Sequence, residues 1–181
     1  MLKEMVLNLN RVVCVLFSAA LTVGAGGTTG IPAGERHLRL FETHTGEHID
    51  IVYRRGDAYD PAALSRLDQF LRDHRTGEVH HYDPRVFDLL SDLTASAALP
   101  DAEIDVICGY RSPWSNEYLR THTAGVAKNS RHMQAEAIDI RLPGLSIAGL
   151  RRKAMLLSRG GVGYYPVSNF VHVDVGPIRH W

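Results

Sequence analysis

The sequence predicts a single α+β domain with a small, mainly antiparallel sheet flanked by helices. Segments with a two-residue apolar period and segments with a helical period are mixed along the chain without regular alternation, which favours α+β over a doubly wound sheet. The 181 residues fit one domain of ordinary size, and no internal repeat or second boundary is visible. The folded domain is expected to span residues 35–181.

The strands are predicted from alternating or short apolar segments. His37–Phe41 alternates polar and apolar residues, a polar break follows at 43–47, and Ile49–Tyr53 resumes the extended pattern, so these segments are expected to form a hairpin. A short buried strand is predicted at Ile104–Cys108. Two later segments also have strand character: Ala137–Leu142 and Phe170–Val175.

The helices are predicted from start signals and from apolar residues that recur every three or four positions. Pro61 marks a helix start, and Leu64, Leu67 and Leu71 then lie on one helical face. A second helix is expected to follow Asp83-Pro84, which is a similar start signal. Two further helical segments are expected around Asn116–Arg120 and across Ile147–Ser158.

The N-terminal segment has the pattern of an export signal. Lys3 and Arg11 precede an uncharged apolar run, and Val23-Gly24-Ala25 resembles a small-residue cleavage site. We therefore expect a signal peptide at residues 1–25, a Gly-rich and Thr-rich linker at 26–34, and an exported protein of the periplasm or cell envelope. The alternative is an uncleaved N-terminal anchor that associates the protein with the inner membrane.

Composition argues against several classes of partner. Lys plus Arg and Asp plus Glu both number 20, so the formal net charge is zero and no excess of basic residues indicates binding to nucleic acid.

The glycine-rich segment Gly160–Tyr165 lacks the Lys-Ser/Thr ending of a phosphate-binding loop and is predicted as a turn entering the last strand. Removal of the signal leaves one cysteine, Cys108, so no internal disulfide is expected.

Three side chains have the types and spacing of a zinc site. His132 and Asp139 lie seven positions apart in a segment predicted to turn into a strand. His172 and Asp174 interrupt an apolar strand at positions i and i+2 and so face the same side. A catalytic zinc has three protein ligands from His and carboxylate groups, a count that His132, Asp139 and His172 supply. By spacing alone, the pattern also fits a buried His–Asp hydrogen bond without a metal.

Six short motifs are distributed along the chain from Arg36 to Trp181: HTGE at 44–47, FLRDHR at 70–75, GYRSP at 109–113, SRHMQAEAIDI at 130–140, GGVGYYP at 160–166, and FVHVDVG at 170–176 with Trp181. With these motifs the chain resembles the YcbK-like murein endopeptidases of the MepK type, members of the D-Ala-D-Ala carboxypeptidase clan of zinc peptidases. The resemblance implies a hedgehog/DD-peptidase-like fold, zinc held by His132, Asp139 and His172, and peptidoglycan stem peptides as substrate.

Three further residues are candidates for catalysis. Arg111, inside the GYRSP motif, is expected to hold a substrate carboxylate or the tetrahedral oxyanion, and a structural salt bridge is the alternative. Asp174 is either the general base or a partner that orients an imidazole, and His180 is the other candidate base. One position departs from the family pattern, because Ala135 stands where the family has Gly; it costs stability if the backbone there needs a positive φ.

The sequence thus predicts a zinc metallopeptidase, a murein endopeptidase that hydrolyses peptide cross-links in peptidoglycan. The alternative is a non-catalytic zinc-binding or peptidoglycan-binding module of the same fold, which keeps the metal site but lacks a base and an oxyanion donor.

Overall fold

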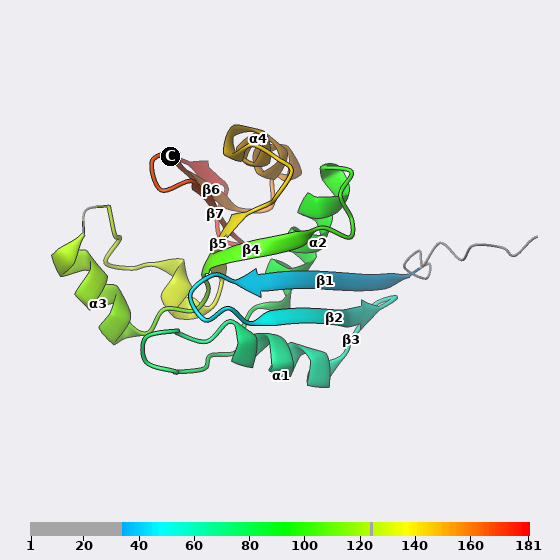
Figure 1. Cartoon of the computed structure of the whole chain (residues 1–181), viewed down its shortest axis with the longest axis horizontal. Coiled ribbons are helices and arrows are strands. Elements are labelled where there is room, and N and C mark those ends of the chain that lie inside the picture. Colours follow the sequence, from blue (N-terminus) through cyan, green and yellow to red (C-terminus); the bar gives the residue numbers. More distant parts are fainter. Residues whose placement is uncertain (1–33, 124) are drawn as a thin grey trace, which may run out of the picture. The chain divides into compact units, whose positions relative to one another are not determined.

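The computed structural model describes residues 34–123 and 125–181, which form an α+β domain (Figure 1). In this part of the chain one sheet contains eight strands: β1 (Glu35–Glu42), β2 (His48–Arg55), β3 (Ala58–Tyr59), β4 (Glu103–Cys108), β5 (Ala137–Arg141), β6 (Gly161–Tyr165), β7 (Phe170–Asp174) and β8 (Arg179–His180). The helices are α1 (Pro61–Phe70), α2 (Pro84–Ser96), α3 (Pro113–His122), α4 (Ile147–Leu157) and the 3-10 helix η1 (Arg131–Gln134). The predicted α+β class is confirmed.

The sheet is mainly antiparallel, as predicted, but it is larger than the small sheet expected. Its order is β3-β2-β1-β4-β5-β7-β6-β8, and β1 pairs with β4, and β6 with β8, in parallel. The extra size comes partly from β3 and β8, which have two residues each and therefore give no periodic signal. The parallel pairing of β1 with β4 joins segments about 60 residues apart, which local patterns do not reveal.

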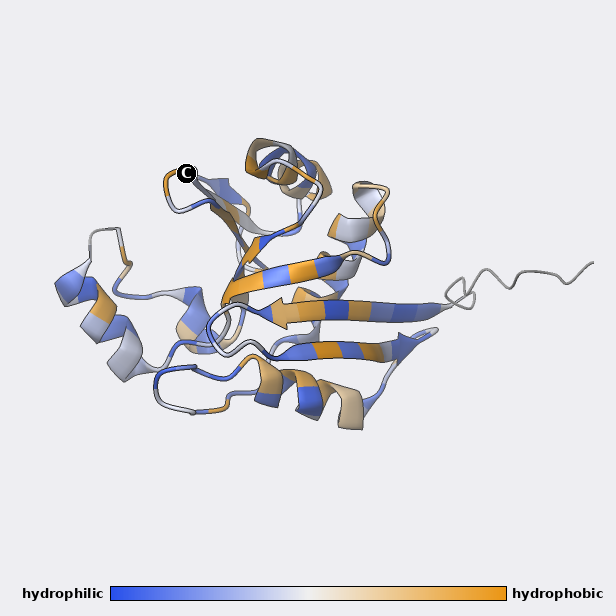
Figure 2. Cartoon of the chain, viewed as in Figure 1, coloured by the Kyte–Doolittle hydropathy of each residue, from blue (hydrophilic) through white to orange (hydrophobic). Residues whose placement is uncertain are grey.

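The hairpin and the first two helices form as the sequence predicts. β1 and β2 are antiparallel, and Figure 2 shows their alternating apolar and polar residues. Asp60 and Asp83 accept hydrogen bonds from the first backbone N–H groups of α1 and α2, and each helix has proline at its first position. These helices pack on β2 and β1, and their apolar faces bury side chains such as Leu67 and Phe87.

The two faces of the central strands have different roles. On one face, apolar side chains of β5 and β7, including Ile138, Ile140 and Val171, belong to the buried core. α4 packs against β6, β7 and α2. Helix α3 stands out from the sheet in Figure 1 and buries only small polar side chains. The opposite face of β5 and β7 carries polar side chains, so the sheet separates the core from the site described below.

One sequence prediction about the sheet is wrong. Gly160–Tyr165 was expected to be a turn, yet Gly161–Tyr165 is strand β6, antiparallel to β7. Its glycines stand where neighbouring chain segments approach the backbone closely: a Cβ on Gly163 would lie 2.7 Å from the Trp181 ring. The low strand propensity of this segment therefore reflects a tertiary requirement for space.

The predictions for the N-terminal segment lie outside the described residues, because the signal peptide at 1–25 and almost all of the linker at 26–34 fall there. Strand β1 begins at Glu35. In residues 34–123 and 125–181, none of the helices combines the length and apolar character needed to cross a membrane.

Candidate metal centre and cleft

A row of residues across four neighbouring strands forms the floor of the site. Cys108 on β4 pairs with Asp139 on β5, Asp139 pairs with His172 on β7, and His172 pairs with Gly163 on β6. Residues paired across a sheet project from the same face. The row therefore presents a thiol, a carboxylate and an imidazole side by side, and the space above the glycine is filled by the Trp181 indole.

Cys108 joins this row because of an irregularity in β4. The register shifts between Val106 and Cys108, since Val106 pairs with Ile140 while Cys108 pairs with Asp139. Strict alternation would direct Cys108 to the same face as Val106, which is the core face. The extra residue at Ile107 reverses that direction and places the thiol beside the carboxylate.

His132 reaches the row from a short turn above the sheet. Ser130 caps η1 by accepting a hydrogen bond from the His132 backbone N–H, and the helix ends at Ala135 with φ +50° and ψ 39°. Ala135 therefore adopts the left-handed conformation that favours glycine, so the positive φ considered for this position is present. The turn is buried at both His132 and Ala135, so the histidine is held in a fixed place.

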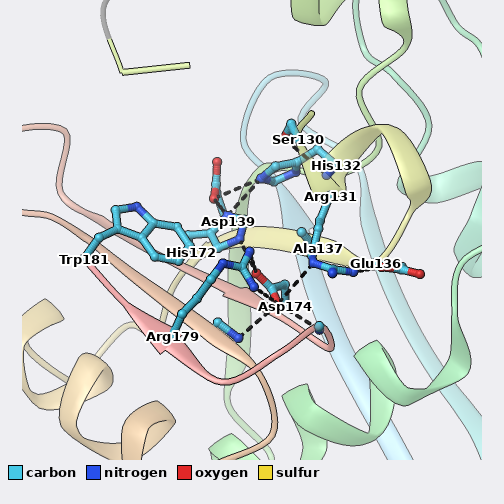
Figure 3. A network of polar contacts seen from close by, with 12 residues as sticks. Ser130, Arg131, His132, Glu136, Ala137, Asp139, His172, Asp174, Arg179 and Trp181 are labelled. Carbon is cyan, nitrogen blue, oxygen red and sulfur yellow. Dashed lines mark hydrogen bonds and ion pairs between the residues drawn. The ribbon is translucent and has the colours of Figure 1, made fainter. Parts of the chain in front are cut away.

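Three candidate ligand atoms meet at one point (Figure 3). His132 Nε2 lies 3.2 Å from Asp139 Oδ1 and 3.1 Å from His172 Nδ1, and His172 Nδ1 lies 2.9 Å from the same carboxylate oxygen. The three residues are only 2%, 6% and 7% exposed, respectively. The structure therefore brings together all three residues that the sequence selected as metal ligands.

The second nitrogen of each imidazole is bound to an acceptor. His132 Nδ1 donates to the Gly109 carbonyl at 2.8 Å, and His172 Nε2 donates to Asp174 Oδ2 at 3.1 Å. Since each ring then carries its proton on the outer nitrogen, the inner nitrogens, His132 Nε2 and His172 Nδ1, present lone pairs to each other and to Asp139. Three electron pairs that face one another in a buried space require a cation among them.

The pKa values of this group reflect the same requirement. Burial opposes the charged form of His132, but the Asp139 carboxylate and the Cys108 thiol raise its pKa to about 10. Burial likewise opposes ionisation of Asp139, yet His132 and His172 hold its pKa well below its usual range. A proton on His132 thus supplies the missing cation when no metal ion does.

Asp174 is enclosed by donors on every side. It is 0% exposed, and Oδ1 accepts hydrogen bonds from the backbone N–H groups of Gly161 (3.0 Å) and Gly176 (2.8 Å). Oδ2 accepts from Arg179 at 2.7 Å as well as from His172. These donors lower the pKa of Asp174 well below its usual range, despite burial. The carboxylate lies across the His172 ring from Asp139, as Figure 3 shows.

Arg111 lies beside the row with its charge incompletely paired. The side chain is buried, and its terminal nitrogens lie 3.3 Å from Cys108 Sγ, 3.3 Å from Asn116 Oδ1 and 3.9 Å from Asp139 Oδ2. Its Nε atom is buried without a hydrogen-bond partner among the residues described. Since a buried guanidinium normally satisfies its donors, Arg111 has capacity to bind a further acceptor.

These groups line a cleft of about 440 Å³. Asp139 is the one carboxylate among the described residues that line it, whereas four arginines do so. His180, the other candidate base, is exposed on β8 and is absent from the lining. The charged, aromatic and thiol side chains that line the cleft but that sequence reasoning did not assign to the site include His44, His74, Arg75, Cys108, Arg131, Tyr165, Arg179 and Trp181.

Comparison with known proteins identifies the family. The family model for peptidoglycan L,D-endopeptidase MepK matches residues 31–181, which is more than four fifths of the chain. The chain belongs to the MepK family. The resemblance predicted from the motifs is thereby confirmed.

Named relatives of the MepK family agree with this membership. The chain is 43% identical to the probable peptidoglycan L,D-endopeptidase MepK of Haemophilus influenzae, over 81% of this chain and 78% of that protein. It is 39% identical to the peptidoglycan L,D-endopeptidase MepK of Escherichia coli K12, over 92% of this chain and 90% of that protein. No solved structure matches the chain significantly.

Proposed function

We propose that the chain is a zinc-dependent peptidase that hydrolyses L,D peptide cross-links in peptidoglycan. The observation that carries the proposal is the convergence of His132 Nε2, Asp139 Oδ1 and His172 Nδ1, all within 3.2 Å of one another, on the floor of the cleft. The relatives in the MepK family, which are named for this activity, support the choice of substrate.

The donor set fits zinc. Two imidazole nitrogens and one carboxylate oxygen are the ligands of many catalytic zinc sites, which keep a fourth position open. A bound zinc ion would lower the pKa of a coordinated water toward about 7 and polarise the scissile carbonyl. The chain's own contribution is to hold the three ligands in place before the metal binds, through the Gly109 carbonyl for His132 and Asp174 for His172.

We assign Asp174 the role of orienting His172. A general base needs to reach the water it deprotonates, but both oxygens of Asp174 are occupied by backbone N–H groups, Arg179 and His172. The carboxylate also lies on the far side of the His172 ring from the other two ligands. Its low pKa makes it a permanent anion that strengthens His172 as a ligand.

We assign Arg111 the role of binding the developing oxyanion or a carboxylate of the substrate. Arg111 lines the cleft, and its terminal nitrogen lies 3.9 Å from Asp139 Oδ2, so a positive charge stands beside the ligand set. A buried guanidinium keeps its proton, so it stabilises negative charge by hydrogen bonding instead of transferring a proton.

The second candidate function is a module that binds zinc and peptidoglycan without cleaving it. One observation favours it: apart from the ligand Asp139, no carboxylate lines the described part of the cleft, so a carboxylate base is missing there. The imidazoles of His44 and His74 are the other proton acceptors in that lining.

Export completes the proposal. The apolar segment at 1–25 has the pattern of a signal peptide or an N-terminal anchor, and peptidoglycan lies outside the inner membrane. We therefore place the protein in the periplasm or cell envelope.

The test is digestion of purified L,D-cross-linked muropeptides by the protein with and without a chelator. We expect one zinc per chain, cleavage that stops on chelation and returns with zinc, and no cleavage by His132→Ala. His122→Ala, which removes an exposed histidine of α3, is the matched control and should cleave normally. Cleavage that survives both chelation and His132→Ala would exclude the zinc mechanism. Stoichiometric zinc without cleavage of any cross-link would establish the binding module.

A further inference from the structure

The main chain of Trp181 is fixed to the edge of the sheet. Its N–H donates to the Val162 carbonyl at 3.2 Å, and its carbonyl accepts from the Tyr164 N–H at 3.0 Å. The preceding residues form β8, which pairs in parallel with β6. The indole is therefore carried by a paired strand, next to the row of site residues.

The indole ring is itself held on three sides. Nε1 donates a hydrogen bond to the Tyr165 hydroxyl at 2.8 Å, and the Arg179 guanidinium lies 5.1 Å from the ring centroid. The ring occupies the space above Gly163, where a Cβ would approach it to 2.7 Å. A glycine inside a strand weakens the strand, but here the missing side chain leaves the room that the indole fills.

The held ring is nevertheless open to the cleft and close to the metal ligands. Its centroid lies 5.2 Å from that of His172, and Figure 3 shows the two rings side by side. Trp181 lines the cleft, yet it remains 46% exposed. An indole with its polar atom already bound and nearly half its area uncovered offers an apolar surface of fixed orientation.

We propose that the Trp181 indole is a wall of the substrate subsite, against which the stem-peptide segment next to the scissile bond packs. This inference rests on the proposed function and names the residue that positions the peptide. Planar amides and short aliphatic side chains pack well on an aromatic surface, and Nε1 is not needed for this contact because Tyr165 already binds it. Because the ring adjoins His172, its occupant lies beside the reacting bond, where the peptide lies and the glycan does not.

A purely structural role is the alternative. Trp181 packs on Arg179, Arg179 binds Asp174, and Asp174 binds His172, so loss of the ring could disturb a ligand through this chain of contacts. The two roles differ in what they change. A substrate wall affects binding of the peptide, whereas support of His172 affects retention of zinc.

The first experiment measures binding without catalysis. The chain contains two tryptophans, so Trp114→Phe leaves Trp181 as the single indole fluorophore. We expect an L,D-cross-linked muropeptide to cause a saturable change in the emission of the chelator-treated Trp114→Phe protein. Absence of any saturable change would overturn the proposal. Because no cleavage is required, a saturable change in a protein that cleaves nothing would uphold the subsite while rejecting the proposed hydrolysis.

The second experiment separates contact from support by kinetics and zinc analysis. We expect Trp181→Ala to raise KM about tenfold while zinc content is unchanged, and Trp181→Phe to recover most of the loss. Gly163→Ala should also raise KM, because the added methyl displaces an intact indole. Trp114→Ala, which removes a 61% exposed indole of α3, is the matched control and should leave KM unchanged. Loss of zinc from Trp181→Ala, or an unchanged KM, would overturn the proposal.

Discussion

Two clusters in the described structure contain the residue types of a metal site, and only one of them is arranged as one. The first cluster is His132, Asp139 and His172, together with Cys108, whose sulfur lies within 4.8 Å of the ligand atoms of His132 and Asp139. The second is Glu42, His44 and His74, whose ligand atoms also lie within 4.8 Å of one another. His44 and His74 line the same cleft as the first cluster. Distance and residue type alone therefore do not distinguish the clusters.

Ring orientation does distinguish them. The planes of His132 and His172 meet at 65°, with centroids 4.9 Å apart, so in-plane lone pairs from both rings can point to one ion. The rings of His44 and His74 are stacked at 16° with centroids 4.0 Å apart. Since the lone pair of an imidazole lies in the ring plane, two nearly parallel rings cannot both direct one at the same ion. The second cluster is a stacked wall of the cleft.

The largest expected effect is the loss of a ligand from the first cluster. His172→Ala should abolish stoichiometric zinc binding and lower kcat/KM by at least about a thousandfold, because the metal supplies several kcal/mol of transition-state stabilisation. His74→Ala should still bind one zinc per chain. The zinc content of the two purified variants tests this difference between the clusters. Loss of zinc from His74→Ala as well would contradict it.

A smaller effect is expected from the group behind a ligand. Asp174→Asn should weaken zinc binding about 10-fold to 100-fold, because the anion that orients His172 is removed. Competition with a chelator measures the change. If Asp174 is instead the general base, the variant will retain its zinc affinity and lose about 10²-fold to 10⁴-fold in kcat.

The two clusters should make the stability of the zinc-free protein depend on pH in opposite directions. The pKa of His132 is raised to about 10, so its stabilising effect is present below its unfolded value near 6.5 and is lost as the pH rises towards 10. Burial, and the proximity of His44 and Arg75, lower the pKa of His74 to about 4, so stability is lost as the pH falls from about 6.5 to 4.

Melting temperatures of chelator-treated protein between pH 4 and 10 measure both windows. Relative to wild type, His132→Gln should flatten the alkaline side and His74→Gln the acidic side. An unchanged alkaline side in His132→Gln would argue against a proton on His132 as the cation of the metal-free state.

The smallest effect is expected at the turn that carries His132. Ala135→Gly removes the left-handed strain, worth about 1 kcal/mol, but also a buried methyl worth about 0.8 kcal/mol. The free energy of unfolding should therefore change by less than about 1 kcal/mol. Ser158 has nearly the same φ, at +51°, and is exposed, so Ser158→Gly should relieve the strain without losing a buried methyl, and it loses only the exposed hydrogen bond from Oγ to the Met155 carbonyl. Denaturant unfolding of both variants measures the difference.

The sequence was sufficient for the parts of the site that follow from local pattern. The alternation of β7 placed His172 and Asp174 on one face, and they contact each other in the structure. The hairpin, the first two helices and β4 were also predicted, since each has a clear period or a capping signal.

The remaining parts depend on pairing between distant segments. Cys108 joins the site through an irregularity in β4, and alternation along the strand predicts the opposite face. The approach of His74 to His44 depends on how the loop after α1 packs against the loop after β1. The role of Trp181 depends on the pairing of β8 with β6, and a strand of two residues is too short to have a pattern that predicts this pairing. Family resemblance identified these motifs without giving their contacts.

The glycines around Asp174 have a consequence for mutational tolerance. A Cβ on Gly160 would lie 1.9 Å from the Asp174 carbonyl oxygen, and a Cβ on Gly161 would lie 2.4 Å from Asp174 Oδ2. In a saturation mutagenesis experiment these positions should be as intolerant as the ligands themselves, even to alanine. Such a result would conventionally be interpreted as a need for a flexible loop, whereas here it would show that Asp174 is held in a rigid frame behind His172.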